Sequence, residues 1–90
     1  MQKLFIIGSL AQMENIHEIH ELFYKLCKVR TVRPYDNLGF FDIFKLTYEN
    51  IKWCDCLIVI TKPNMTLGEN VTYELEFAKQ LNKTILYYVP

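Results

Sequence analysis

Glu74 is the residue whose type and position most directly suggest chemistry. If residues 67–81 form a helix, apolar side chains recur at the spacing of one buried face, at Leu67, Val71, Leu75, Ala78 and Leu81. At about 100° per residue, Glu74 projects into the middle of that stripe. Burying an unpaired carboxylate is costly or raises its pKa, so Glu74 suggests a functional acid. The alternative is a partly covered acid that the helix dipole favours near the N-terminus.

Other candidates for ligand contact fall in predicted loops. Gly8 and Ser9 follow the first apolar run, where backbone N–H groups and a hydroxyl can bind an anion, although two small residues also suit a plain tight turn. Tyr35 and Asp36 follow Pro34 and are better placed for a ligand than for the core. These residues are therefore predicted to line a binding site.

The cysteines and histidines show no metal-binding pattern. Cys27, Cys54 and Cys56 form neither an even disulfide set nor paired C-x-x-C motifs, and they are predicted to be buried thiols. His17 and His20 have no convincing third ligand on their face and are predicted to lie at the surface or rim. We expect no metal and no cofactor.

The elements that position these residues alternate between strand and helix. Apolar and alternating runs predict strands at 3–7, 29–33, 56–61 and 84–89. Helices are predicted at 40–53, at 67–81 and along the stripe Ile16, Ile19, Phe23, Leu26 and Cys27. This βαβαβαβ order predicts an α/β three-layer sandwich with a flavodoxin-like or Rossmann-like parallel sheet in strand order 2-1-3-4.

In such a sheet, ligands bind at the carboxyl ends of the strands, at the switch between the first and third strands. The loops expected there are 8–12, 34–39 and 61–68, with Glu74 just beneath the last. The loops lack the acidic residues of a phosphoacceptor receiver domain. They also lack the G-x-G-x-x-G motif of a dinucleotide site.

Size and charge restrict the class of protein. The 90 residues, 51% of them apolar, predict a single domain spanning 1–90, and so small a core makes a homodimer or higher oligomer plausible. Ten basic and ten acidic residues cancel, which argues against binding to duplex nucleic acid. No apolar run is long enough for a membrane span or signal peptide, so a cytoplasmic protein without membrane contact is predicted.

Several motifs together resemble those of the nucleoside 2-deoxyribosyltransferase superfamily, closest to its small branch, the 2′-deoxynucleoside 5′-phosphate N-hydrolases. The resemblance covers most of the chain and is strongest in the last forty residues. It is carried by Gly8-Ser9, Cys54-Asp55-Cys56-Leu57-Ile58-Val59, Thr61, Pro63, Gly68, Tyr73-Glu74-Leu75, Ala78 and Asn82-Lys83-Thr84-Ile85-Leu86.

The resemblance implies cleavage or transfer at the N-glycosidic bond of a (deoxy)nucleoside or its 5′-monophosphate. Glu74 matches the family's nucleophile, which attacks C1′ to form a glycosyl-enzyme; a carboxylate suits that role because it also stabilises oxocarbenium-like charge. Gly8, Ser9 and Gly68 match positions of the substrate pocket. Tyr73 also matches, although its helical direction predicts packing rather than contact.

Departures from the family pattern keep alternatives open. Thr47 stands on an inward helix face where the family usually has a catalytic Asp, so catalysis can be slow or absent. Ala11 replaces the usual basic residue after the Gly-Ser turn, which removes a partner for a 5′-phosphate. The alternatives are a non-catalytic nucleotide-binding or sequestering module on the same fold and an NAD glycohydrolase.

Overall fold

The chain folds around a parallel sheet whose strand order is β2-β1-β3-β4, as the sequence predicts. The computed structural model describes residues 2–31 and 40–90, with the backbone alone for residues 10 and 40–43. The strands are β1 (Lys3–Ile7), β2 (Lys28–Thr31), β3 (Cys56–Ile60) and β4 (Thr84–Tyr88). Every neighbouring pair is parallel, with Phe5 of β1 opposite Leu57 of β3 in the centre. Each crossover therefore carries a helix back across the sheet.

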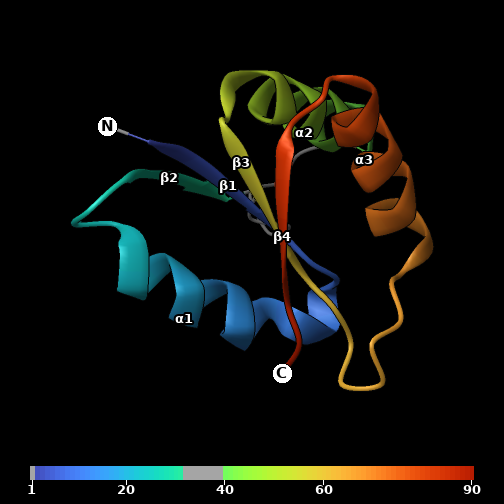
Figure 1. The fold of residues 1–90 in the computed structure, drawn as a ribbon. Helices are drawn as coiled ribbons and strands as arrows, with labels where there is room; N and C mark the ends of the chain where they lie inside the picture. The colour runs from blue at the N-terminus through green and yellow to red at the C-terminus, as the bar shows by residue number, and fades with distance from the viewer. Residues whose placement is uncertain (1, 32–39) are drawn as a thin grey trace.

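The helices form an outer layer on each face of the sheet (Figure 1). The helix α1 (Met13–Phe23) follows a short 3-10 turn, η1 (Leu10–Gln12), and covers one face. The helices α2 (Phe40–Trp53) and α3 (Glu69–Gln80) cover the other. This arrangement is the predicted three-layer α/β sandwich.

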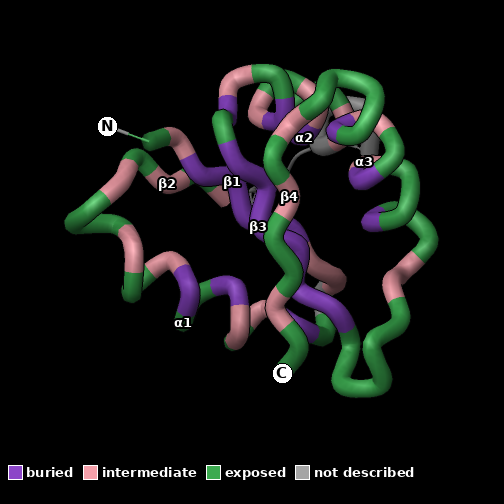
Figure 2. The backbone as a smooth tube through the Cα atoms, in the orientation of Figure 1, coloured by how far each residue is buried: buried purple, intermediate pink, exposed green. Residues whose placement is uncertain are grey.

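Two apolar clusters fill the spaces between the layers, and successive residues of a strand contribute to opposite clusters. Leu4 and Ile6 pack toward α1, whereas Phe5 and Ile7 pack toward α2 and α3. The central strands β1 and β3 are the most buried part of the chain (Figure 2). A run of five buried residues in β3 confirms the continuous apolar pattern as that of a two-faced core strand.

The ends of two helical stripes were predicted wrongly. Leu26 is 71% exposed because α1 ends at Phe23 and the chain turns, with the Leu26 and Cys27 amides bonded to the Phe23 carbonyl. Leu81 is 39% exposed because it caps α3. There Asn82 adopts φ 56°, and the Lys83 amide bonds to the Ala78 carbonyl, which reverses the chain before the stripe continues.

Side chains at the amino edge of the sheet fix the end of α2. The Lys83 ammonium donates hydrogen bonds to the carbonyls of Lys52 and Cys54, at 2.9 and 2.8 Å, where the helix dipole favours a cation. Asp55 accepts a hydrogen bond from the backbone N–H of Lys3 at 3.1 Å. That contact joins the start of β1 to the turn before β3.

Candidate functional site

The first and third loops of the predicted crevice meet in the structure. A Cβ built on Gly68 would lie 3.9 Å from the Cβ of Ser9, so the start of α3 approaches the turn after β1. Gly8 allows a second close approach, because a Cβ there would lie 3.3 Å from both Ile16 Cδ1 and Ile60 Cβ. Gly8, Ser9 and Gly68 therefore lie together at the carboxyl edge of β1 and β3.

Local hydrogen bonds order the loop from β3 to α3. Asn64 Oδ1 accepts from the Thr66 amide at 3.2 Å and from the Thr66 hydroxyl at 2.6 Å. Met65 takes φ 67°, and the Lys62 amide closes the loop onto the Thr66 carbonyl at 2.9 Å. This Asx-type turn lies in the connection from β3 to α3, which contains no strand or helix of its own.

Glu74 lies in the second turn of α3, beside the buried residues Val71, Leu75 and Ala78. Its side chain is only partly buried, so helical spacing predicted its inward direction correctly, and the partial cover agrees with both the functional interpretation and the helix-dipole alternative. Burial raises the pKa of Glu74 from 4.5 to about 7, and no charged group in the described part of the chain offsets this effect. At neutral pH, the carboxyl is therefore close to half ionised.

Thr47 lies on the sheet-facing side of α2 and is 3% exposed, as predicted. An edge-to-face contact between Tyr48 and Phe77, with ring centroids 4.6 Å apart, sets the relative level of α2 and α3. Because Glu74 precedes Phe77 by three residues, it lies about 4.5 Å nearer the carboxyl edge of the sheet than Phe77 does. Thr47 and Glu74 therefore both lie on the carboxyl-edge side of this ring contact.

Gln12 is a buried polar residue that the sequence interpretation missed. It is 6% exposed, and its Oε1 accepts a hydrogen bond from the Ser9 hydroxyl. A signal was available, because Gln12 precedes Ile16 by four residues and Ile19 by seven. It therefore continues the apolar stripe of α1, as Glu74 does that of α3.

The remaining candidates have different positions. Tyr35 and Asp36 lie outside the described residues, so their predicted ligand contact stays a prediction. Tyr73 is 57% exposed, so the prediction that it packs was wrong: neither the sheet nor α2 covers its side of α3. The predicted buried thiols are found at Cys54 and Cys56, whose pKa burial raises, whereas Cys27 is only partly buried.

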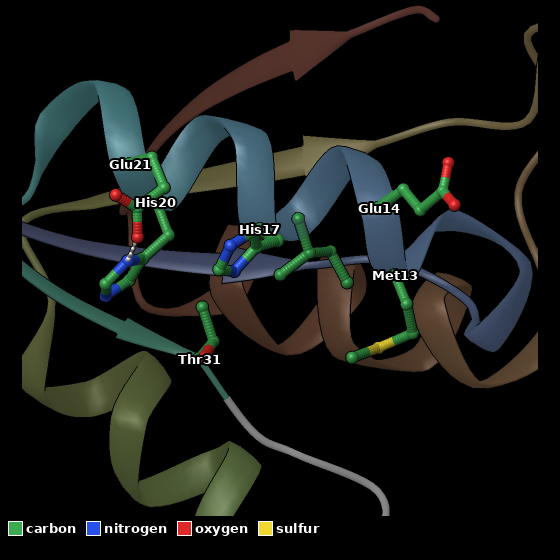
Figure 3. Close-up of a pocket in the computed structure, with 7 residues that line it drawn as sticks. Met13, Glu14, His17, His20, Glu21 and Thr31 are labelled. Carbon is green, nitrogen blue, oxygen red and sulfur yellow. Dashed lines mark ion pairs between the residues drawn. The ribbon is translucent and has the colours of Figure 1, made fainter.

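A separate groove runs along α1 beside the end of β2 (Figure 3). Its walls include His17, His20 and Thr31, and the His20 ring is 3.8 Å from the Glu21 carboxylate. Glu14 points away from both imidazoles (Figure 3). Within residues 2–31 and 40–90, no group of three or more His, Cys, Asp or Glu side chains is placed to hold a metal ion.

Comparison with solved structures identifies the fold. A 2-deoxyribosyltransferase from Leishmania mexicana superposes with a TM-score of 0.72 at 22% identity, over 99% of this chain and 65% of that one. The CMP N-glycosidase BcmB from Clostridium botulinum superposes with a TM-score of 0.70 at 19% identity, over 96% of this chain and 70% of that one. The chain has the nucleoside 2-deoxyribosyltransferase-like fold.

The nucleoside 2-deoxyribosyltransferase-like fold covers nearly the whole of this chain, in agreement with the resemblance of the sequence motifs. The sequence matches no protein-family model and no curated protein. This chain spans 65% of the length of the Leishmania enzyme. Among the helices of the described residues, none is long and apolar enough to cross a membrane.

Proposed function

We propose that this chain cleaves or transfers at the N-glycosidic bond of a (deoxy)nucleoside or its 5′-monophosphate, with Glu74 as the nucleophile. The observation that carries the proposal is a partly buried carboxylate without a compensating charge among the described residues. Its helix, α3, starts where Gly68 approaches Ser9. Two solved structures that share the fold are named as a 2-deoxyribosyltransferase and a CMP N-glycosidase, and such names fit chemistry at an N-glycosidic bond.

The reaction proceeds in two displacements at the anomeric carbon. A carboxylate oxygen of Glu74 forms a bond to C1′ while the C1′–N bond breaks, and the electron pair leaves with the base, which takes up a proton. The oxygen of water, or a nitrogen of a second base, then bonds to C1′ and releases the carboxylate, and the incoming group gives up a proton to solvent, which replaces the proton that the leaving base took up. Partial burial strengthens the attraction between Glu74 and the positive charge that develops on the sugar.

The protonation state of Glu74 suits this role. A nucleophile must be ionised, and a pKa of about 7 leaves a substantial fraction ionised at neutral pH. Since burial also removes hydrating water, the ionised form is a stronger nucleophile than an exposed carboxylate.

The test is chromatographic detection of free base after incubation with deoxynucleosides, their 5′-monophosphates and NAD. Wild type should release base from at least one class, and Glu74→Gln should lower kcat by about 10³-fold or more while keeping ligand binding. Glu69→Gln is the matched control, because Glu69 lies exposed in the first turn of the same helix. Equal base release by wild type and Glu74→Gln would contradict the proposal.

A second candidate is a binding module that sequesters nucleotides without cleaving them. Thr47 favours it, because the resemblance assigns a catalytic Asp to this buried position. A leaving base that lacks an acid loses roughly 10²–10⁴ in rate. This candidate predicts no free base from any member of the panel but a ligand-dependent rise in melting temperature.

A further inference from the structure

Gln12 uses its side chain in an unusual way for its position. It is the N-cap residue of α1, with φ −102° and ψ 18°, yet its side chain makes no capping hydrogen bond. N-cap residues are commonly Ser, Thr, Asp or Asn, whose side-chain oxygen accepts from a free helix amide. Burying a carboxamide is costly unless it is hydrogen-bonded, so the contact that Gln12 does make is informative.

That contact is with Ser9. The Gln12 amide donates to the Ser9 carbonyl at 2.9 Å, and the Gln12 Oε1 accepts the proton of the Ser9 hydroxyl. A serine hydroxyl has a single proton to donate. Because Gln12 takes that proton, Ser9 Oγ has only its lone pairs left for another group.

Ser9 is also the residue of this turn that faces α3. Its Cβ lies 3.9 Å from the site of a Cβ on Gly68, and its side chain is only partly buried. Resting on the function proposed above, we infer that Gln12 is a positioning residue that makes Ser9 a hydrogen-bond acceptor toward the ligand. The site then selects a ligand hydroxyl or amino donor at this place and disfavours a phosphate.

The charges around Ser9 agree with this selection. Phosphate oxygens are acceptors, so they gain nothing from an oxygen that has no proton to offer. Ala11 of the same turn brings no charge, and Lys62 is the only Lys or Arg in segments 8–12 and 61–68. Lys62 is exposed just beyond β3. We therefore expect unphosphorylated nucleosides to be preferred over their 5′-monophosphates.

The experiment measures kcat/KM for the adenine, guanine, cytosine and thymine 2′-deoxynucleosides and for their 5′-monophosphates. For the base that wild type prefers, kcat/KM should be higher for the nucleoside than for its 5′-monophosphate. Gln12→Met, which keeps the length of the side chain but cannot accept the proton, should lower the nucleoside-to-monophosphate ratio by roughly tenfold or more. Gln12→Glu, whose carboxylate accepts the same proton, should restore the nucleoside preference that Gln12→Met loses.

The ratio separates a positioning role from a merely structural one, because a loss of stability lowers both activities together. In a Ser9→Ala background, Gln12→Met should leave the ratio unchanged, since the hydroxyl is gone. In a Lys62→Ala background, the Gln12→Met shift should persist. Preference of wild type for the monophosphate, or an unchanged ratio in Gln12→Met, would overturn the inference.

Failure of the proposed function gives a different result. If wild type releases base from no substrate, the same ratio is measured from ligand-dependent shifts in melting temperature. A nucleoside preference that Gln12→Met removes would support the inference in a non-catalytic site. Absence of any shift with these ligands would overturn both proposals.

Discussion

Glu74 makes the stability of the protein depend on pH. Its pKa is about 7 in the folded state against 4.5 for an ordinary glutamate, so folding favours its protonated form. Between these values the folded state binds more protons than the unfolded state, and stability falls as pH rises. Below pH 4.5 the group costs nothing, and above pH 7 the cost is complete.

The fall of stability with rising pH predicts how Glu74→Gln behaves in denaturant unfolding. Above pH 7 the variant should be more stable than wild type by roughly 1–3 kcal/mol, because it removes the cost of a buried charge. The difference should shrink as pH falls toward 4.5. A difference that stays constant from pH 4.5 to 8 would mean that Glu74 is not the titrating group.

Ionisation of Glu74 lowers stability, but it should increase activity. Since the nucleophile must be ionised, kcat/KM for base release should rise with pH through an apparent pKa near 7. The control is the pH profile of Glu69→Gln, which should match wild type. A flat profile between pH 5 and 8 would contradict ionisation of Glu74 as the controlling event.

Position 47, where the resemblance implies a catalytic Asp and this chain has Thr47, can be tested by substitution. We expect Thr47→Asp to raise the rate of base release by about 10²-fold, because a carboxyl at this buried position can assist the leaving base. The variant should also be less stable than wild type, since it buries a second carboxyl. Thr47→Asn, which has similar shape without an acidic proton, should not increase kcat.

At the scale of elements, Gly8 sets the distance between α1 and the sheet. Gly8→Ala should lower the free energy of unfolding by about 1–3 kcal/mol, because the new methyl group meets Ile16 and the fixed Cβ of Ile60 at 3.3 Å. Urea unfolding measures the loss. Gly68→Ala is the matched control, because among the described residues its methyl group would meet only Ser9, at an ordinary contact distance of 3.9 Å, and should cost less.

At the scale of the whole molecule, the two edges of the sheet differ in charge. The edge strand β2 carries Lys28 and Arg30, both exposed, and charged side chains discourage pairing with another chain. Segment 84–90, which contains the edge strand β4, has no charged side chain. Leu86 and Tyr87 of this segment are 53% and 55% exposed. The predicted homodimer would therefore use the β4 edge.

Leu86→Lys tests that interface. If two copies pair through β4, the charge should shift sedimentation equilibrium toward monomer, because two lysines would face each other across the two-fold axis. Leu22→Lys is the control, since Leu22 is 64% exposed on α1, whose main strand contacts are with β1 and β2 rather than with β4. An equal effect of both substitutions would assign the association to general surface hydrophobicity.

Much of the fold follows from local sequence periodicity. Continuous apolar residues from Cys56 to Ile60 predict a strand with two buried faces, and strict alternation with helices leaves few topologies for a parallel sheet. The bounds of α2 were predicted without error. The inward direction of Glu74 was likewise predicted, because helical spacing depends only on the residue's own element.

Only the tertiary structure decided which surfaces are covered and which segments meet. The exposure of Tyr73 and Leu81 depends on where the neighbouring layers end. The periodicity of residues within one helix carries no information about those positions. The pairing of Ser9 with Gln12 depends on a turn whose hydrogen bonds are specific to its backbone path. The sequence by itself thus determined the elements and the inward carboxylate. The approach of Gly68 to Ser9 and the raised pKa of Glu74 required the packed chain, because desolvation comes from neighbours that are distant in sequence.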